Sequence, residues 1–234
     1  MRWISWAWAA WAAGCLAGPQ LPAQAPPAPP APQALFAVVL DAAHGGSDTG
    51  ARLAGGQLEK NVTLALSVRL RSLLAARGFS VVTTRETDTF LSPDQRAGIA
   101  NQARAQACLI LHATASGSGV HLFVSALAPS APLPIPAWKT AQSGWVTRSL
   151  ALAGTLNSAL LAAGINVTLG RIDLPGLDSM TCPAVAVEAG PEPASGENPA
   201  AGADSSDYQA QVATALAAAL LEWRASAWRG GARP

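Results

Sequence analysis

The sequence predicts an α/β layered domain, with a largely parallel central sheet flanked by helices on both faces. Short runs of aliphatic and β-branched residues, which have the composition of buried strands, alternate along the chain with longer segments of helical periodicity. No internal repeat interrupts this alternation. We therefore expect one domain over residues 34–228, preceded by a separate N-terminal region and followed by a short tail at 229–234.

The elements follow one another in a regular order. The first strand is expected at Leu35–Asp41, and a glycine-rich loop follows it. A helix should begin at Glu59 and continue to Arg77, because its apolar residues recur every three or four positions and Gly78 comes directly after it. The segment Ser92–Gln95 supplies an N-cap, a proline at the first helical position and a capping-box glutamine. The other expected elements are strands at 80–84, 108–112, 119–126 and 184–187, and helices at 93–107, 144–163 and 206–226.

The composition indicates one well-buried domain and excludes a nucleic-acid surface. The chain has 234 residues, 50% of them hydrophobic and 12% charged, and a net charge of +1, which leaves no basic stripe for nucleic acid. After the N-terminus no run reaches the roughly 18 uninterrupted apolar residues of a spanning helix, so we expect a soluble domain. Cys108 and Cys182 lie in apolar, strand-like surroundings, and we interpret them as inert core thiols.

The N-terminal region predicts export. Residues 1–18 carry one positive charge followed by an almost wholly apolar run, which is typical of a secretory signal peptide or an N-terminal anchor. Small residues precede Cys15, so lipidation at this cysteine, ordinary cleavage and an uncleaved anchor remain open. Residues 19–33 are rich in proline and alanine and should form an extended linker. We expect a periplasmic or cell-envelope location, with membrane contact only through this region.

Polar side chains stand at the ends of the buried strands or in the loops after them. His44 lies in a loop with Gly45 and Gly46 after the first strand, and His112 and Glu188 end two other strands. Glu59 opens the first long helix. Because neighbouring parallel strands end at the same edge of a sheet, we expect His44, Glu59, His112 and Glu188 to converge there.

These residue types fit a hydrolytic zinc site. Two neutral imidazoles and one carboxylate complete a catalytic zinc shell that leaves a fourth position for water, and the metal would lower the pKa of that water to about 7. A second carboxylate could take the proton of the water and transfer it to a leaving nitrogen. Other chemistries fit less well, because the chain has neither a Gly-x-Ser-x-Gly elbow nor a Gly-x-x-x-x-Gly-Lys phosphate loop.

Structural interpretations of the same residues stay open. Glu59 could be a first-turn acid stabilised by the helix dipole, and His112 could be a core histidine bonded to a carbonyl. A carboxylate at the end of a buried strand needs a partner, so Glu188 is harder to explain in this way. The third histidine, His121, alternates with apolar residues in a strand, and we interpret it as a residue of the polar face.

A series of residues along the chain resembles the pattern of a known family. The matching series, in chain order, is Val39-Leu40-Asp41, His44-Gly45-Gly46-Ser47-Asp48, Gly50-Ala51, Glu59-Lys60, Thr84-Arg85, Asp88, Phe90-Leu91, Arg96, Ala100-Asn101, Leu111-His112-Ala113, Pro183-Ala184-Val185, Val187-Glu188 and Gly190. It is similar to the zinc-dependent N-acetylmuramoyl-L-alanine amidases from about residue 36 to 222. The resemblance implies a mixed α/β catalytic domain with Zn²⁺ held by His44, Glu59 and His112, and with Glu188 as the catalytic glutamate. The implied reaction is hydrolysis of the amide between N-acetylmuramic acid and L-alanine in peptidoglycan. Apart from the resemblance, we expect the chain to be a monomer.

Three departures from the family pattern stand next to these residues. Ala42-Ala43 replaces the usual Pro-Gly, Thr114 replaces an asparagine, and Ala189-Gly190-Pro191 leads into a low-complexity loop at 191–203. The altered walls keep two rivals open: a peptidoglycan-binding module with little catalysis, and a zinc peptidase that cuts within the stem peptide. No long helical insertion of the autoinhibitory kind is evident between residues 126 and 183.

Overall fold

The structure, a computed structural model, describes residues 35–131, 137–194 and 200–229. The predicted leader at 1–18, the linker at 19–33 and the tail beyond Arg229 lie outside these residues. Within the described ranges, no helix combines the length and the apolar character that crossing a bilayer requires.

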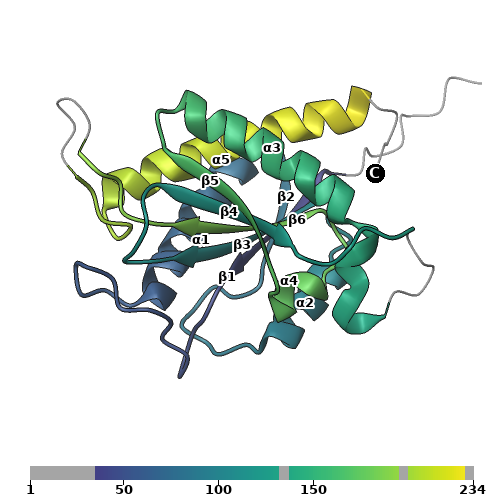
Figure 1. Cartoon of the computed structure of the whole chain (residues 1–234), viewed down its shortest axis with the longest axis horizontal. Helices are drawn as coiled ribbons and strands as arrows, with labels where there is room; N and C mark the ends of the chain where they lie inside the picture. Colours follow the sequence, from purple (N-terminus) through teal and green to yellow (C-terminus); the bar gives the residue numbers. More distant parts are fainter. Residues whose placement is uncertain (1–34, 132–136, 195–199, 230–234) are drawn as a thin grey trace, which may run out of the picture. The chain divides into compact units, whose positions relative to one another are not determined.

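A six-stranded sheet forms the middle layer (Figure 1). Its strands lie in the order β2-β1-β3-β6-β4-β5. Every neighbouring pair is parallel except β4 with β6, which is antiparallel. The predicted mixed, largely parallel sheet is therefore confirmed. The strands are β1 (Ala37–Ala42), β2 (Ser80–Thr83), β3 (Ala107–Ala113), β4 (Val120–Ser125), β5 (Val167–Ile172) and β6 (Ala184–Ala189).

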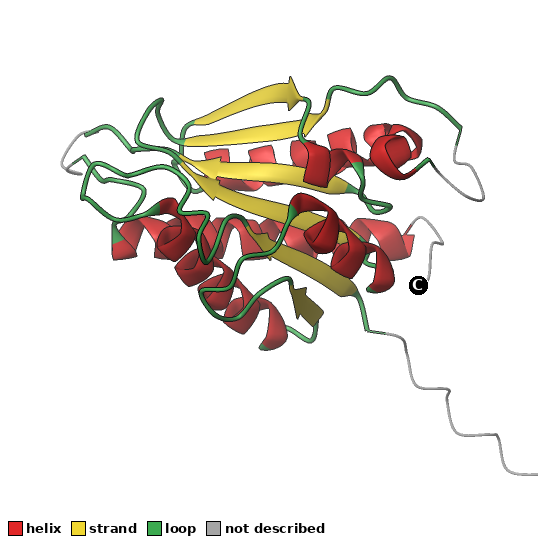
Figure 2. Ribbon diagram, turned by 90° about the horizontal axis from the view of Figure 1, so that it is seen from below, coloured by secondary structure: helices red, strands yellow, loops and turns green. Residues whose placement is uncertain are grey.

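Helices cover both faces of this sheet, as Figure 2 shows. Buried residues of α1, α3 and α5 pack with Leu109 and Leu111 of β3 on one face, whereas α2 and α4 pack with Cys108 and Ile110 on the other. Because β3 is buried on both sides, its sequence is a continuous apolar run rather than an alternating one. The helices are α1 (Glu59–Ala75), α2 (Pro93–Gln102), α3 (Val146–Ala162), α4 (Pro175–Asp178), α5 (Ser206–Arg229) and the 3₁₀ helix η1 (Trp138–Gly144).

The structure differs from the sequence-based expectation at a few elements. β5 is an edge strand with mostly exposed side chains, and Gly170 and Arg171 interrupt its apolar residues, so no strand is predicted there from the sequence. The short elements α4 and η1 are also absent from the prediction. α2 ends at Gln102 rather than near residue 107, because Arg104 adopts a left-handed φ of 48° and turns the chain towards β3.

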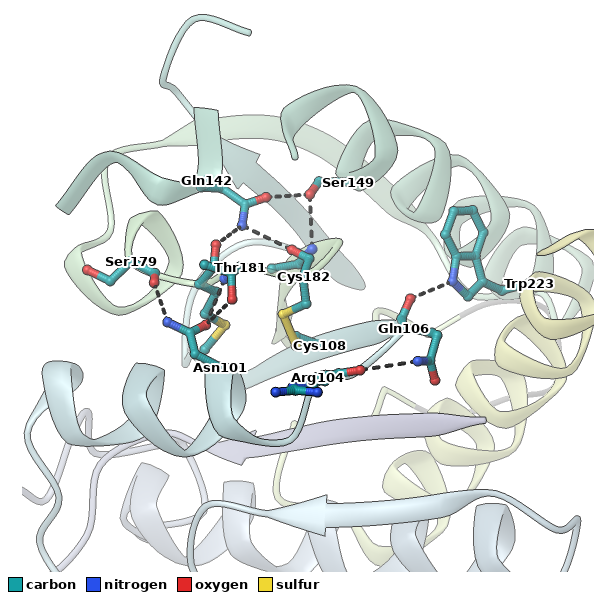
Figure 3. The surroundings of a disulfide bond; sticks show 12 residues. Asn101, Arg104, Gln106, Cys108, Gln142, Ser149, Ser179, Thr181, Cys182 and Trp223 are labelled. Atoms are coloured by element: carbon teal, nitrogen blue, oxygen red, sulfur yellow. Dashed lines mark hydrogen bonds between the residues drawn. A yellow bond between two sulfur atoms is a disulfide. The ribbon is translucent and has the colours of Figure 1, made fainter. Parts of the chain in front are cut away.

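Cys108 and Cys182 form a disulfide, so the interpretation of both as inert thiols is wrong (Figure 3). Cys182 lies just before β6, and β6 pairs with β3, which carries Cys108. The sheet thus brings together two cysteines that are 74 residues apart, with their Cα atoms at 6.2 Å. The loop that carries Cys182 is held by Gln142, whose side-chain nitrogen donates to the backbone oxygens of Met180 and Cys182 at 2.9 and 3.1 Å.

Candidate metal centre

Three of the predicted site residues meet at the edge of the sheet where the parallel strands end. His44 lies in the loop after β1, Glu59 is the first residue of α1, and His112 is the penultimate residue of β3. One potential metal-binding atom from each of them lies within 4.8 Å of the other two. The two imidazole rings face each other edge to face, with their centroids 5.3 Å apart. The structure therefore brings these three side chains together.

Glu59 lies between the two imidazoles. Its Oε1 accepts hydrogen bonds from His112 Nδ1 at 2.9 Å and from the backbone N–H of Ala113 at 3.1 Å. Its Oε2 lies 3.1 Å from His44 Nε2 and accepts from the backbone N–H of Ala51 at 2.9 Å. Burial alone would raise the pKa of Glu59, but the hydrogen bonds from His112, His44 and Ala51 outweigh it and hold the pKa well below its usual range. This side chain is thus an ionised carboxylate with both oxygens aimed at the space between the rings.

His44 has a strained backbone that is fixed by its own loop. Its φ is 63°, a left-handed conformation that costs a non-glycine residue about 1–2 kcal/mol. Nδ1 donates to Asp48 Oδ1 at 2.9 Å, and this bond leaves Nε2 facing Glu59. The hydrogen bond to Glu59 raises the pKa of His44. A carboxylate behind one ring nitrogen is the usual way to orient a metal-binding histidine.

The His44 loop is fastened to its neighbours by charged side chains. Lys60 Nζ donates to the backbone oxygen of Gly46 at 2.8 Å and to Asp88 Oδ2 at 2.7 Å, while Asp88 Oδ1 accepts from the Gly46 N–H at 2.7 Å. Beneath the loop, the Arg85 guanidinium donates to the backbone oxygens of Ala43 and Lys60 at 3.1 and 2.7 Å. These bonds tie the end of β1 to the start of α1, and so fix His44 relative to Glu59.

A glycine seats the loop directly on the cluster. Gly50 has a φ of +62°, and a Cβ placed on it would lie 2.6 Å from Glu59 Oε2 and 2.7 Å from His44 Cδ2. Any larger residue would therefore displace the side chains that define the cluster. Two imidazoles and one carboxylate form a donor set that zinc prefers, and the glycine lets the chain close around it without filling it. The residues present fit a zinc ion.

Glu188 lies beside this cluster on the next strand. It is the register partner of His112 in the parallel β3–β6 pair, and directly opposed residues of neighbouring strands point to the same face of a sheet. On its other side Glu188 is the register partner of His121 in the antiparallel β4–β6 pair. His121 Nδ1 donates to Glu188 Oε2 at 2.9 Å. His121, expected from its alternation only to lie on the polar face, therefore contacts Glu188, and no signal in the sequence predicts this contact.

The face that carries these residues is covered along only part of its length. Cys108 and Ile110 of β3 lie under α2 and α4, and His112 follows them on the same face after one more alternation. The exposed fractions of the His112 and Glu188 side chains are 23% and 31%, whereas Ile110 is buried. Solvent therefore reaches the C-terminal ends of β3 and β6, where the cluster lies.

Comparison with solved structures supports this description of the fold. The catalytic domain of CwlV, an N-acetylmuramoyl-L-alanine amidase from Bacillus (Paenibacillus) polymyxa var. colistinus, matches with a TM-score of 0.62 and 24% identity, over 81% of this chain and 98% of that chain. The N-acetylmuramyl-L-alanine amidase Ami1 from Mycobacterium smegmatis matches with a TM-score of 0.65 and 22% identity, over 82% of this chain and 97% of that chain. At these identities the likeness establishes the fold alone.

Sequence relatives match over shorter stretches. The amidase AmiA of Escherichia coli (strain K12) is 42% identical over 76 residues, which are 32% of this chain and 26% of that protein. An N-acetylmuramoyl-L-alanine amidase of Mycobacterium tuberculosis is 32% identical over 155 residues, 61% of this chain and 59% of that protein. The matches thus span between about a quarter and three fifths of these two relatives. A sequence model of one family, however, matches residues 38–222, and by that match the chain belongs to the N-acetylmuramoyl-L-alanine amidase family.

Proposed function

We propose that this chain is an exported, zinc-dependent amidase that hydrolyses the bond between N-acetylmuramic acid and L-alanine in peptidoglycan. The observation that carries the proposal is the clustering of His44, Glu59 and His112 beside Glu188, in a chain that belongs to the amidase family. The two imidazoles and the carboxylate would hold the zinc ion. When bound there, zinc supplies Lewis-acid chemistry, since it polarises a carbonyl and makes a water acidic enough to react near neutral pH.

Glu188 is the residue that we assign to proton transfer. Its carboxylate lies on the same sheet face as His112, and one oxygen, Oε1, has no hydrogen bond to another described residue. This oxygen can accept the proton of the attacking water and deliver it to the amide nitrogen, which leaves as the free amino group of L-alanine. The same carboxylate therefore serves first as base and then as acid.

Zinc binding can be tested with the three histidines of the chain. Metal analysis of the purified wild-type protein should find a single zinc ion per chain, and His44→Ala and His112→Ala should each lose it. His121→Ala is the matched control, because His121 lies outside the cluster of three ligands, and it should retain zinc. Unchanged zinc content in both His44→Ala and His112→Ala would refute the site.

The reaction can be tested by digestion of purified sacculi with the zinc-loaded protein. An amidase should release intact stem peptides with a free N-terminal L-alanine, identified by mass. The altered wall of the site motivates the rival of a peptidoglycan-binding module, which would bind sacculi and release nothing. Fragments of the stem peptide would instead indicate a zinc peptidase.

The proposed location depends on the N-terminal 33 residues. The disulfide supports export, because such bonds persist mainly in oxidising compartments. N-terminal sequencing of the mature protein would find the cleavage site. If the wild-type protein is found in the membrane fraction and the Cys15→Ser variant in the soluble fraction, Cys15 carries a lipid.

We further propose that the domain 34–228 is monomeric, which light scattering can test.

A further inference from the structure

We propose that His121 is a positioning residue, which holds the Glu188 carboxylate in its working orientation through the hydrogen bond from Nδ1. The inference deepens the proposed function, because it rests on the assignment of Glu188 to proton transfer. The two residues are direct register partners in the antiparallel β4–β6 pair, and Nδ1 lies 2.9 Å from Oε2. Side chains of such a pair extend from the same face of the sheet, so the contact is built into the strand pairing.

The bond to His121 is the main constraint on the Glu188 side chain. Within the described parts of the chain, no other side-chain or backbone group forms a hydrogen bond or ion pair with this carboxylate. Glu188 is 31% exposed, and a glutamate with no partner at such a site would sample several rotamers. One fixed oxygen restricts that sampling and keeps the carboxylate beside His112.

His121 is itself held in place by the turn before β4. Gly117 has a φ of +79°, and a Cβ placed on it would lie 2.3 Å from His121 Cε1 and 2.7 Å from Nε2. The backbone of this turn therefore lies against the imidazole. Gly119, in the same turn, accepts from the N–H of Gly190 and donates to the oxygen of Pro191, so the turn is bonded to the chain that follows β6. Only 15% of the His121 side chain is exposed.

The hydrogen bond from His121 gives the two carboxylate oxygens of Glu188 different roles. An ionised carboxylate only accepts hydrogen bonds, so Nδ1 must carry the proton. Oε2 is then occupied by the imidazole N–H, and Oε1 is the oxygen that remains to accept a proton from water. His121 thus selects both the rotamer of Glu188 and the oxygen that reacts.

The test replaces His121 by residues that place a hydrogen-bond donor near Nδ1, near Nε2 or at neither position. The amide nitrogen of an asparagine can stand near Nδ1 of a histidine, whereas that of a glutamine stands nearer Nε2. We expect His121→Leu to lower kcat on a soluble muramyl peptide by about 10- to 100-fold, the range found when partners that orient metal ligands are removed. KM and zinc content should stay unchanged. His121→Asn should recover most of kcat, and His121→Gln should not.

Two controls separate positioning from a general structural role. Thr168→Val changes an exposed residue on β5 that is also a register partner of His121, and it should leave kcat unchanged. In a Glu188→Gln background, His121→Leu should cause no further loss, because the two residues act as one unit. A full additional loss in that background, or equal kcat for the Asn and Leu variants, would overturn the inference.

The protonation of the His121 ring can be measured by NMR without any turnover, so the positioning role can be tested separately from the proposed reaction. Imidazole ¹H–¹⁵N correlation spectra of the zinc-loaded protein should show His121 protonated at Nδ1, and Glu188→Ala should change this signal. A wild-type ring protonated at Nε2 and not at Nδ1 would overturn the positioning role even if sacculi are digested. Conversely, if the wild type releases no stem peptides although His121 shows the expected tautomer, the proposed function fails instead.

Discussion

The two ends of β3 and β6 carry different chemistry on the same face of the sheet. At the start of these strands, Cys108 and Cys182 are bonded to each other and buried among residues of α2 and α4, and Gln142 of η1 donates to the backbone oxygen of Cys182. At the other end, His112 and Glu188 are partly exposed and bonded to other polar side chains. One pair of strands thus holds a covalent link at one end and a reactive cluster at the other.

The difference between these ends shows how burial determines what a residue can do. At the disulfide end the buried polar groups of Gln142 and Ser149 are bonded to other protein groups, since Ser149 donates to Gln142 and accepts from the N–H of Ala184. At the other end, which holds the candidate metal centre and is called the metal end below, the side chains of His112 and Glu188 are partly exposed, so a ligand can reach them from solvent. We infer that the disulfide end contributes stability and the metal end contributes chemistry, and that each can be changed with little effect on the other.

The largest effect should come from the metal end. Glu188→Gln keeps the shape of the side chain and removes the base, so turnover should fall by about 10²–10⁴-fold. Zinc content and the midpoint of thermal unfolding should match the wild type. Glu222→Gln, an exposed change on α5, is the control and should leave turnover intact. Digestion of sacculi by Glu188→Gln at the wild-type rate would show that the role is wrongly assigned.

The next effect concerns the disulfide end. The double variant Cys108→Ala, Cys182→Ala opens a link across 74 residues, which in the chain-entropy model lowers the free energy of unfolding by about 4 kcal/mol. Urea denaturation measures this change. Under conditions where the variant is still folded, its zinc affinity and kcat should equal those of the wild type. A loss of zinc affinity in the folded variant would show that the two ends are coupled.

A smaller effect is expected from the residue that orients His44. Asp48→Ala removes the acceptor for Nδ1, and zinc affinity should fall by about 10- to 100-fold in a chelator competition. Asp48→Asn retains an acceptor oxygen and should lie closer to the wild type. The free energy of unfolding of the metal-free protein separates a loss of affinity from a loss of fold. Equal zinc affinity of the Ala variant and the wild type would show that Asp48 does not orient the ring.

The smallest effect again concerns the disulfide end. Ser149→Ala leaves the N–H of Ala184 without its partner, which should cost about 1–2 kcal/mol of stability, measured by urea denaturation. Turnover should not change, because Ala184 begins β6 and Glu188 lies near its end. Ser158→Ala, on the exposed side of the same helix, should alter stability by less than about 0.5 kcal/mol. A drop in turnover for Ser149→Ala would contradict the separation of the two ends.

Much of the fold and part of the site can be predicted from the sequence. β1, β3 and β6 are buried on both faces, and their unbroken apolar runs reveal them. The convergence of His44, Glu59 and His112 follows from where parallel strands end. The identity of the metal and the role of Glu188 stay predictions.

The rest depends on strand order and direction, which spacing does not encode. The disulfide is hidden because nothing in the sequence shows that β6 lies beside β3. His121 is hidden for a related reason. A search for site residues at the ends of parallel strands overlooks β4, which runs in the opposite direction and so brings its second residue, rather than its last, to the site.

The disulfide between Cys108 and Cys182 affects when the chain becomes stably folded. If the chain is exported as proposed above, both sulfurs would be thiols in a reducing cytoplasm, and the unfolded ensemble would keep all its conformational freedom. The newly made chain would therefore be easier to keep unfolded for translocation than the mature protein. Oxidation on the far side of the membrane would then make folding harder to reverse, and stability would be gained only at the destination.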